Sequence, residues 1–154
     1  MAGSSPEIKW PNDLLVDDRK LAGILAEVAA GAVVVGMGMN VHSAPPGAAF
    51  LDASAGRRVG RRALMVAWLK ALDRLARDWD AVMTQYRSEC ATVGREVVVD
   101  QADGSRWSGR AEGIDDDGRL LVGAPDGALK ALSVGDVTHL RARPPAQGPG
   151  QPGW

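Results

Sequence analysis

Lys9, Asn12, Asp13, Lys20 and Gly23 lie within one short stretch of the chain, KWPNDLLVDDRKLAGILAE at residues 9–27. A lysine ammonium is a compact cation that suits phosphate or carboxylate oxygens, and an aspartate can hold Mg²⁺. Asparagine donates and accepts hydrogen bonds, and glycine lets a ligand touch the backbone. If paired strands bring these residues together, they suit a site for a nucleotide and for a carboxylate that it activates.

Each of these residues also has a structural explanation. Pro11-Asn12-Asp13 is typical of a tight turn. Lys9 and Lys20 suit strand edges, where a charge blocks association with another sheet. Residue types alone favour this structural interpretation, so the site hypothesis depends on the combination of motifs.

A second segment with glycines, VVVGMGMNV, occupies residues 33–41. Gly36 and Gly38 alternate along it, and a glycine in a strand weakens packing but leaves room for close approach. The pair is not a dinucleotide-binding fingerprint, because Val41 stands where that pattern requires a third glycine. Asn40 either faces a ligand or ends the strand.

The first 41 residues predict the strands that would carry these groups. Apolar runs separated by Pro-Asn, Asp-Asp and Ala-Ala-Gly breaks indicate short strands in a mostly buried sheet. We expect these strands at residues 8–10, 13–16, 20–28 and 33–41. Residues 43–60 are rich in Pro, Gly and small residues, which predicts a loop.

One long amphipathic helix is predicted from Arg61 to about Tyr86. Its charged residues are typical of a solvated face rather than of a partner surface. The preceding GRRVGRRAL, residues 56–64, is interpreted as the start of this helix, with an arginine contact to phosphate as the alternative. Apolar residues recur at spacings of three and four and form one stripe: Leu64, Trp68, Leu72, Leu75, Trp79, Val82 and Tyr86.

Beyond Gly94 the apolar residues alternate with period two, and Asp-Gly pairs at 103–104, 117–118 and 126–127 predict tight hairpins. This pattern indicates a small meandering barrel, hence a second domain. Asp115-Asp116-Asp117 is therefore interpreted as a hairpin turn rather than a cation site. The expected domains are residues 1–91 and 92–143, followed by a disordered tail at 144–154 that is rich in Pro, Gly and Gln.

The 154 residues are 45% hydrophobic and 24% charged, with a formal net charge of −1. This composition is typical of a soluble globular protein and gives no indication of nucleic-acid binding. Cys90 is the single cysteine, and no segment reads as a signal peptide or a membrane span, so we expect a cytoplasmic protein. His42 and His139 have no partners at metal or triad spacing and are interpreted as solvated or core residues.

The combination of KWPNDLLVDDRKLAGILAE with VVGMGMNV strongly resembles the biotin protein ligases, which biotinylate acetyl-CoA carboxylase and its relatives. GDVTHLRAR resembles the end of the small SH3-like C-terminal domain of that family. The resemblance covers nearly all of residues 7–143 and implies an α+β fold. That fold is a mixed β-sheet with a long covering helix, as an incomplete class II synthetase-like ligase core, followed by a small SH3-like β-barrel.

The resemblance also implies a two-step reaction. Biotin and Mg-ATP form biotinyl-5'-adenylate, and a lysine of the carrier domain of a biotin-dependent carboxylase then attacks the mixed anhydride. The implied small molecules are therefore ATP, biotin and Mg²⁺. The implied protein partner is the biotin carboxyl carrier domain, and a homodimer remains open.

Residue by residue, the resemblance implies that Lys20 and Asp13 are catalytic. Lys20 matches the lysine that contacts biotin and the adenylate phosphate, and Asp13 matches the ATP and magnesium side as a metal ligand. The implied cofactor-binding set is Lys9 next to the phosphates, Asn12 and Asn40 on the nucleotide, Gly23 at the biotin pocket, and Gly36 and Gly38.

The sequence departs from the family in front of KWPND. The family's loop rich in glycine and arginine, which closes over biotin and the adenylate, would precede that motif, where eight residues stand here. We therefore expect the chain to correspond to the rear part of a ligase, with half of the active site absent and little activity of its own. The alternative is a noncatalytic binding or scaffold fragment that keeps the fold and engages the carrier protein.

Overall fold

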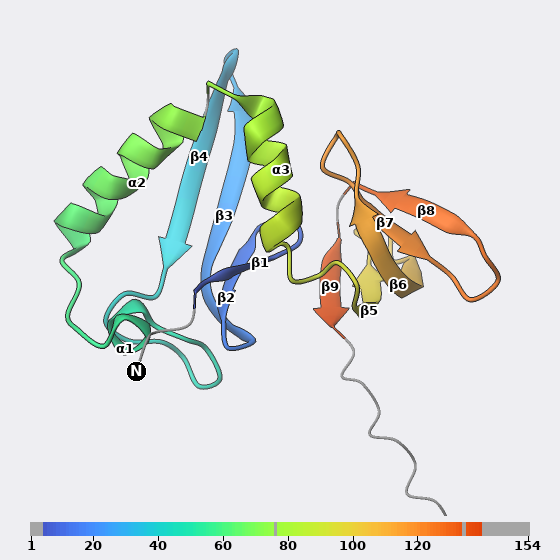
Figure 1. Ribbon diagram of the computed structural model, residues 1–154, viewed down its shortest axis with the longest axis horizontal. Coiled ribbons are helices and arrows are strands. Elements are labelled where there is room, and N and C mark those ends of the chain that lie inside the picture. The colour runs from blue at the N-terminus through green and yellow to red at the C-terminus, as the bar shows by residue number, and fades with distance from the viewer. Residues whose placement is uncertain (1–4, 76, 134, 140–154) are drawn as a thin grey trace, which may run out of the picture.

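The chain forms two β-sheets, which lie on opposite sides of Figure 1. The computed structural model describes residues 5–75, 77–133 and 135–139. The predicted tail at 144–154 lies outside these described residues. Three helices connect the sheets along the chain, namely α1 (Leu51–Ala55), α2 (Arg61–Leu75) and α3 (Trp79–Glu89). The predicted α+β fold class is confirmed.

The first sheet is a meander with the strand order β1-β2-β3-β4. Its strands are β1 (Glu7–Lys9), β2 (Asp13–Val16), β3 (Arg19–Ala29) and β4 (Ala32–Met39). Asp17 and Asp18 adopt φ values of 52° and 57°, which makes the tight turn between β2 and β3 possible. The strand pairs are antiparallel, and a parallel pairing enters through the isolated bridge between Ile8 and Cys90.

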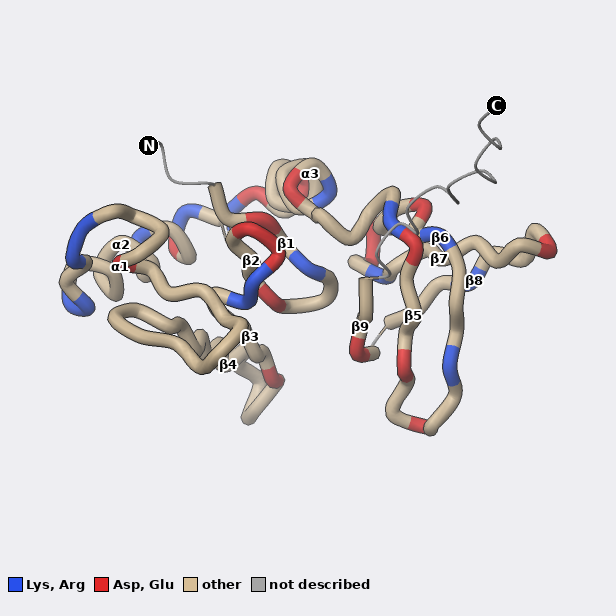
Figure 2. Tube along the Cα trace, turned by 90° about the horizontal axis from the view of Figure 1, so that it is seen from below, with Lys and Arg blue, Asp and Glu red and all other residues tan. Residues whose placement is uncertain are grey.

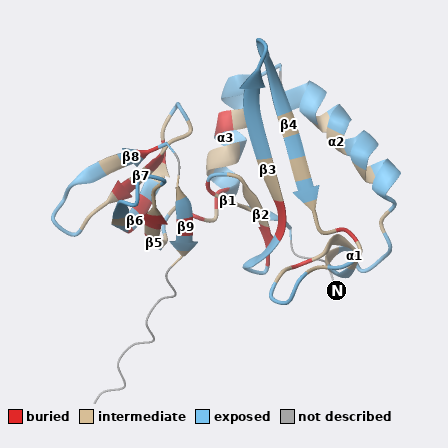
Figure 3. Ribbon diagram, turned by 180° about the vertical axis from the view of Figure 1, so that it is seen from behind, coloured by how far each residue is buried: buried red, intermediate tan, exposed pale blue. Residues whose placement is uncertain are grey.

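The far part of the β3–β4 hairpin is exposed, which corrects the expectation of a mostly buried sheet. Leu25, Val28 and Val33 are 75%, 80% and 66% exposed. Figure 3 shows this end of the hairpin in pale blue, whereas the buried residues of this sheet lie near the β2–β3 turn. An apolar run allows a strand to be buried but does not provide the element that would cover it. Among the described elements, β3 and β4 chiefly contact each other in this far part of the hairpin.

The predicted single helix is divided in two. Asp78 has an extended backbone, with φ −144° and ψ 91°, and its side chain accepts a hydrogen bond from the Ala81 amide. This is the geometry of a helix N-cap, so a new helix begins at Trp79. α2 has no buried residue, whereas α3 buries Met83. None of the helices in the described part of the chain has the length and apolar character needed to cross a bilayer.

The second sheet has the order β8-β7-β6-β5-β9. Its hairpins use the predicted Asp-Gly pairs, with Gly104, Gly118 and Gly127 at φ values of 82°, 79° and 86°. Alternate residues point inward, so that Val97 and Val99 are both fully buried. The strands are β5 (Glu96–Asp100), β6 (Arg106–Ile114), β7 (Leu120–Gly123), β8 (Leu129–Leu132) and β9 (Asp136–His139).

The larger core belongs mainly to the second sheet, but Trp10 from the β1–β2 turn is part of it. Trp10 is 1% exposed, and Met83 and Cys90 also join this core from α3 and its end. A smaller core around Val16 and Leu21 holds the β2–β3 turn against the loop before α1. The motif that carries the candidate site is therefore fixed by both sheets.

Candidate functional site

The turn between β1 and β2 places Lys9 opposite Asp13. The peptide bond between Trp10 and Pro11 is cis, and the turn is tied to β3 by Asn12. The Asn12 side-chain amide donates to the Ile24 carbonyl at 2.7 Å, and the Ile24 amide donates to the Asn12 carbonyl at 2.8 Å. Asn12 therefore shapes the turn, as its structural interpretation expects.

Asp13 and Lys20 form an ion pair, with 2.7 Å between Lys20 Nζ and Asp13 Oδ1. The Asp13 side chain is 19% exposed and the Lys20 side chain 56% exposed, so the lysine presents its ammonium toward solvent. The paired strands thus bring together the two implied catalytic residues. The association depends on the β2–β3 register, since these residues are seven positions apart in sequence.

Glycines form the surface next to this ion pair. Asp13 is paired with Gly23, and Gly23 is paired in turn with Gly38 on β4. Opposite residues of paired strands share one face, so these three positions form a row across β2, β3 and β4. A Cβ atom at Gly38 or at Gly36 would meet nothing within 4 Å. The row leaves bare backbone beside the Asp13–Lys20 pair, where a ligand can approach closely.

Asn40 lies just after β4 and holds the loop that follows. Its side-chain amide donates to the carbonyl of Ala49 at 3.1 Å and to that of Lys20 at 3.4 Å. The Leu51 amide donates to the Asn40 carbonyl at 2.8 Å. Asn40 thus supports the backbone at Lys20, and its amide hydrogens are directed at protein carbonyls.

An open groove of about 1280 Å³ lies between the two sheets. Lys9, Asp13 and Lys20 line its first wall, and Arg95 and His139 belong to the opposite wall. Figure 2 shows acidic and basic residues next to one another along β1 and β2. The groove thus has both charges along its walls, with Lys9, Lys20 and Arg95 among several carboxylates, so a ligand that brings anionic oxygens would have to bind at the lysines. The acidic residues of its lining are Asp13, Asp17, Asp18, Glu96 and Asp136.

The sequence predicts no partner for His139, but the structure places it against two polar groups. Its Nε2 lies 3.0 Å from Thr92 Oγ1, and its Nδ1 lies 3.3 Å from Arg95 Nη1. Burial and the positive charges of Arg95 and Lys9 lower the pKa of His139 to about 4. Spacing along the sequence gave no indication of this cluster, because β5 and β9 pair across about 40 residues.

His42 also has a partner that sequence reasoning missed. Its Nδ1 lies 2.8 Å from Asp52 Oδ2, and the Val59 amide donates to Asp52 Oδ1 at 2.7 Å. The hydrogen bonds from His42 and Val59 hold the pKa of Asp52 below its usual range. These bonds close the loop that begins after Asn40, so His42 has a structural role.

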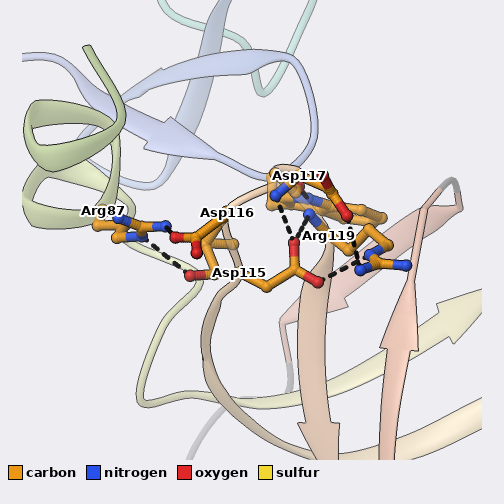
Figure 4. A network of polar contacts seen from close by, with 8 residues as sticks. Arg87, Asp115, Asp116, Asp117 and Arg119 are labelled. Atoms are coloured by element: carbon orange, nitrogen blue, oxygen red, sulfur yellow. Dashed lines mark hydrogen bonds and ion pairs between the residues drawn. The ribbon is translucent and has the colours of Figure 1, made fainter. Parts of the chain in front are cut away.

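The acidic run 115–117 forms a turn, as predicted. Asp115 accepts hydrogen bonds from the backbone amides of Asp117 and Arg119, and its carboxylate pairs with the Arg119 guanidinium at 2.7 Å. Figure 4 shows Asp116 directed at Arg87 of α3, with 2.6 Å between Asp116 Oδ1 and Arg87 Nη2. The carboxylates thus pair with arginines, and no cluster of metal-ligating side chains occurs among residues 5–75, 77–133 and 135–139.

Two family models match the chain. The model described as "Biotin/lipoate A/B protein ligase family" matches residues 2–43, and "Biotin protein ligase C terminal domain" matches residues 92–140. The first segment contains all of the implied site residues. The second contains the strands of the second sheet up to the end of the described chain.

Two curated proteins illustrate the relatives. The biotin–[acetyl-CoA-carboxylase] ligase of Mycobacterium tuberculosis is 40% identical over 149 residues, which cover 87% of this chain and 53% of that protein. The bifunctional ligase/repressor BirA of Bacillus subtilis is 29% identical over 151 residues, which cover 86% of this chain and 46% of that protein. The chain thus spans about half the length of these relatives.

Solved structures show the same fold. The biotin protein ligase of Aquifex aeolicus in complex with biotin and ATP matches with a TM-score of 0.74 and 22% identity, covering 92% of this chain and 64% of that chain. The Helicobacter pylori biotin acetyl coenzyme A carboxylase synthetase, solved with bound biotinylated ATP, matches with a TM-score of 0.58 and 22% identity, covering 84% of this chain and 57% of that chain.

Proposed function

Since the chain belongs to the biotin protein ligase family, we propose that it contributes the Lys20–Asp13 side of a site for ATP-dependent biotin attachment. The reaction would pass through biotinyl-5'-adenylate to a lysine of a biotin carboxyl carrier domain. The observation that carries this proposal is the ion pair between Lys20 and Asp13 over Gly23, beside the bare backbone of Gly38.

Lys20 is proposed to supply the positive charge that adenylation requires. The carboxylate of biotin must attack the α-phosphate of ATP, and both groups are anionic. An ammonium held between them stabilises the negative charge that develops as the new bond forms and pyrophosphate leaves. Asp13 fixes the Lys20 ammonium at 2.7 Å, so the cation is already oriented when the substrates bind.

Gly23 and Gly38 are proposed to line the adjoining ligand surface. The Asp13 and Lys20 side chains occupy the space above Gly23, whereas the space above Gly38 is open, so the ring of a bound ligand can lie directly on the backbone of β4 next to the ion pair. Gly36 extends the same face by two residues along β4. Lys9 faces Asp13 across the turn and would neutralise the phosphate oxygens farther from the reacting carboxylate.

Asp13 fits a site for Mg²⁺. Magnesium is usually held by one or two carboxylates together with substrate phosphates. Oδ1 of Asp13 contacts Lys20, and the second carboxylate oxygen, Oδ2, would be the ligand for the cation. When bound with ATP, the ion would neutralise charge on the phosphates, and Asp13 is the residue of this chain that would hold it.

A noncatalytic binding role is the second candidate function. Asn12 and Asn40 direct their amide hydrogens at protein carbonyls, so two of the implied nucleotide contacts have structural roles here. A protein that retained the fold for such structural reasons would engage a carrier domain without forming adenylate.

Dimerisation is a separate proposal, and sedimentation at several protein concentrations tests it.

Calorimetric titration with biotin and with Mg-ATP separates the two candidates. For the first, we expect the chain to bind both ligands, and Lys20→Met to weaken the binding of each. Lys70→Met on the exposed surface of α2 is the matched control and should bind like the unmodified chain. Binding of a carrier domain without binding of biotin or Mg-ATP would support the second function and contradict the first.

A further inference from the structure

Trp10 lies inside the site motif, but its side chain belongs to the other half of the molecule. It follows Lys9 directly and precedes the cis peptide bond to Pro11. The indole is 1% exposed and packs among core residues of the second sheet. The turn that carries Lys9, Asn12 and Asp13 is thus anchored at its centre to β-strands that carry none of the implied site residues.

Directed hydrogen bonds accompany this packing. Trp10 Nε1 donates to the Gly118 carbonyl at 2.9 Å, and the Trp10 backbone amide donates to Thr92 Oγ1 at 3.0 Å. Thr92 is fully buried. The Tyr86 hydroxyl donates to the Pro11 carbonyl at 3.1 Å, and burial raises the pKa of Tyr86, which keeps it a donor. The orientation of the turn is therefore set from the second sheet and α3.

The hydrogen-bonded chain continues from Thr92 back to the first sheet. Thr92 Oγ1 contacts His139 Nε2, and Arg95 lies 3.3 Å from His139 Nδ1. Because a guanidinium can only donate, Nδ1 accepts and Nε2 carries the proton that His139 donates to Thr92. Arg95 also pairs with Asp18 at 2.8 Å, two residues before Lys20. This polar chain connects the two turns that carry Lys9 and Lys20.

We infer that Trp10, Thr92 and His139 are positioning residues, through which the second sheet holds the Lys9–Asp13 turn in the geometry that ligand binding requires. The inference rests on the proposed function for its catalytic consequence. Packing alone would require only an apolar side chain at position 10. The two hydrogen bonds from Trp10 fix instead the direction in which the chain leaves the core, and therefore where Lys9 and Asp13 point.

The chain supplies matched controls. Trp107 packs against the same core, but its buried Nε1 has no hydrogen-bond partner among the described residues. Trp10→Phe removes a bonded indole N–H, and Trp107→Phe removes an unbonded one. Thr92→Val deletes the hydroxyl that receives the Trp10 amide, Thr92→Ser retains it, and Thr84→Val makes the same change on the exposed surface of α3.

Two measurements test the inference. Amide hydrogen exchange read by NMR reports the opening of the turn at Asn12 and Asp13, and calorimetry reports the affinity for Mg-ATP. In Thr92→Val the buried Trp10 amide loses its hydrogen-bond acceptor, which destabilises the native turn. We therefore expect about tenfold faster exchange at Asn12 and Asp13, and about tenfold weaker Mg-ATP binding. Thr92→Ser should restore both values, and Trp10→Phe should act in the same direction as Thr92→Val.

The outcomes separate this inference from the proposed function. If Thr92→Val and Trp10→Phe leave exchange at Asn12 and Asp13 as in Thr84→Val and Trp107→Phe, Trp10 is only a core residue and the inference is wrong. If the unmodified chain binds no Mg-ATP but the exchange effect appears, the proposed function fails while the positioning of the turn stands. Thermal unfolding of each variant identifies any that fails to fold, and the remaining variant of the pair then decides.

Discussion

Asp13 and Gly23 lie opposite one another in the β2–β3 pair, and a Cβ atom on Gly23 would stand 3.2 Å from Asp13 Oδ1. The same Cβ would lie 3.5 Å from Lys20 Nζ. The absence of a side chain at position 23 therefore keeps open the space in which the carboxylate and the ammonium meet. Glycine at position 23 therefore allows the Asp13 carboxylate and the Lys20 ammonium to form their ion pair.

Gly23→Ala is expected to weaken biotin and Mg-ATP binding by about tenfold, because the added methyl group crowds and displaces the Asp13–Lys20 pair. A tenfold change in Kd corresponds to about 1.4 kcal/mol of binding free energy. The thermal midpoint should change little, since the pair is partly exposed. Titration calorimetry and thermal unfolding measure the two effects. Gly113→Ala is the control, because a Cβ there meets nothing within 4 Å. Equal effects of both substitutions would contradict the role of Gly23.

When the glycine- and arginine-rich loop of the family is supplied by fusion or in trans, Lys20→Met is expected to slow biotinyl-5'-adenylate formation by about one to several powers of ten. A charge-assisted hydrogen bond contributes roughly 1.5–3 kcal/mol, and Lys20 is proposed to make one to each substrate. Lys9→Met should cost less and act mainly through the dependence on ATP. Pyrophosphate release at varied biotin and varied ATP measures both variants. Normal adenylation by a Lys20→Met protein that unfolds early would make Lys20 a structural edge charge.

Stability should fall on mild acidification because of His139. Burial first, and then Arg95 and Lys9, lower the pKa of His139 to about 4, against the opposing charge of Asp18. The unfolded chain titrates near 6.5, so the contribution is fully present above about pH 6.5 and is lost as the pH falls toward about 4. Urea unfolding across this range should show a slope that His139→Gln reduces. The same slope in both proteins would assign it to other groups.

Amide exchange should be fastest in the far part of the β3–β4 hairpin. Val97 and Val99 are fully buried, whereas Val28 is 80% and Val33 66% exposed. Local opening there exposes little additional apolar surface, so its free-energy cost is low. We expect the amides of 97–99 and 120–122 to be protected longer than those of 28 and 33–35. Equal protection of both regions in a monomer would show that another contact covers the hairpin.

The sequence predicted the local structure that brings the candidate site residues together, because the motifs are short in sequence. The β1–β2 turn needs only Pro11-Asn12-Asp13, and the Asp13–Lys20 pair needs only a hairpin whose turn is Asp17-Asp18. Regular alternation and Asp-Gly pairs likewise predicted the strands of the second sheet. These features depend on neighbours within a few residues, which a pattern can register.

The sequence did not predict the break between α2 and α3, the roles of the two asparagines, or the Trp10–Thr92–His139 contacts. These features depend on residues far apart in sequence or on local patterns that favour different structures. The apolar spacing in the sequence runs from Arg61 to Tyr86 without a break and so predicts one helix. In the structure, the N-cap hydrogen bond of Asp78 starts a separate helix. Asn12 and Asn40 have side chains that suit a nucleotide contact, but no pattern in the sequence shows that nearby carbonyls accept their amide hydrogens. Thr92, His139 and Trp10 are separated by up to 129 positions, from 10 to 139, so no spacing rule connects them.

The insertion of Trp10 into the second sheet limits how such proteins can be recombined. A chimaera joined between residues 91 and 92 would inherit the indole from one parent and its hydrogen-bond partners, Thr92 and the Gly118 carbonyl, from the other. Crossovers near this junction should therefore succeed only when the donor segment accommodates a tryptophan. The boundary between the two sheets along the chain therefore differs from the boundary in three dimensions. A graft should succeed best when Trp10 and its partners Thr92 and Gly118 come from the same parent.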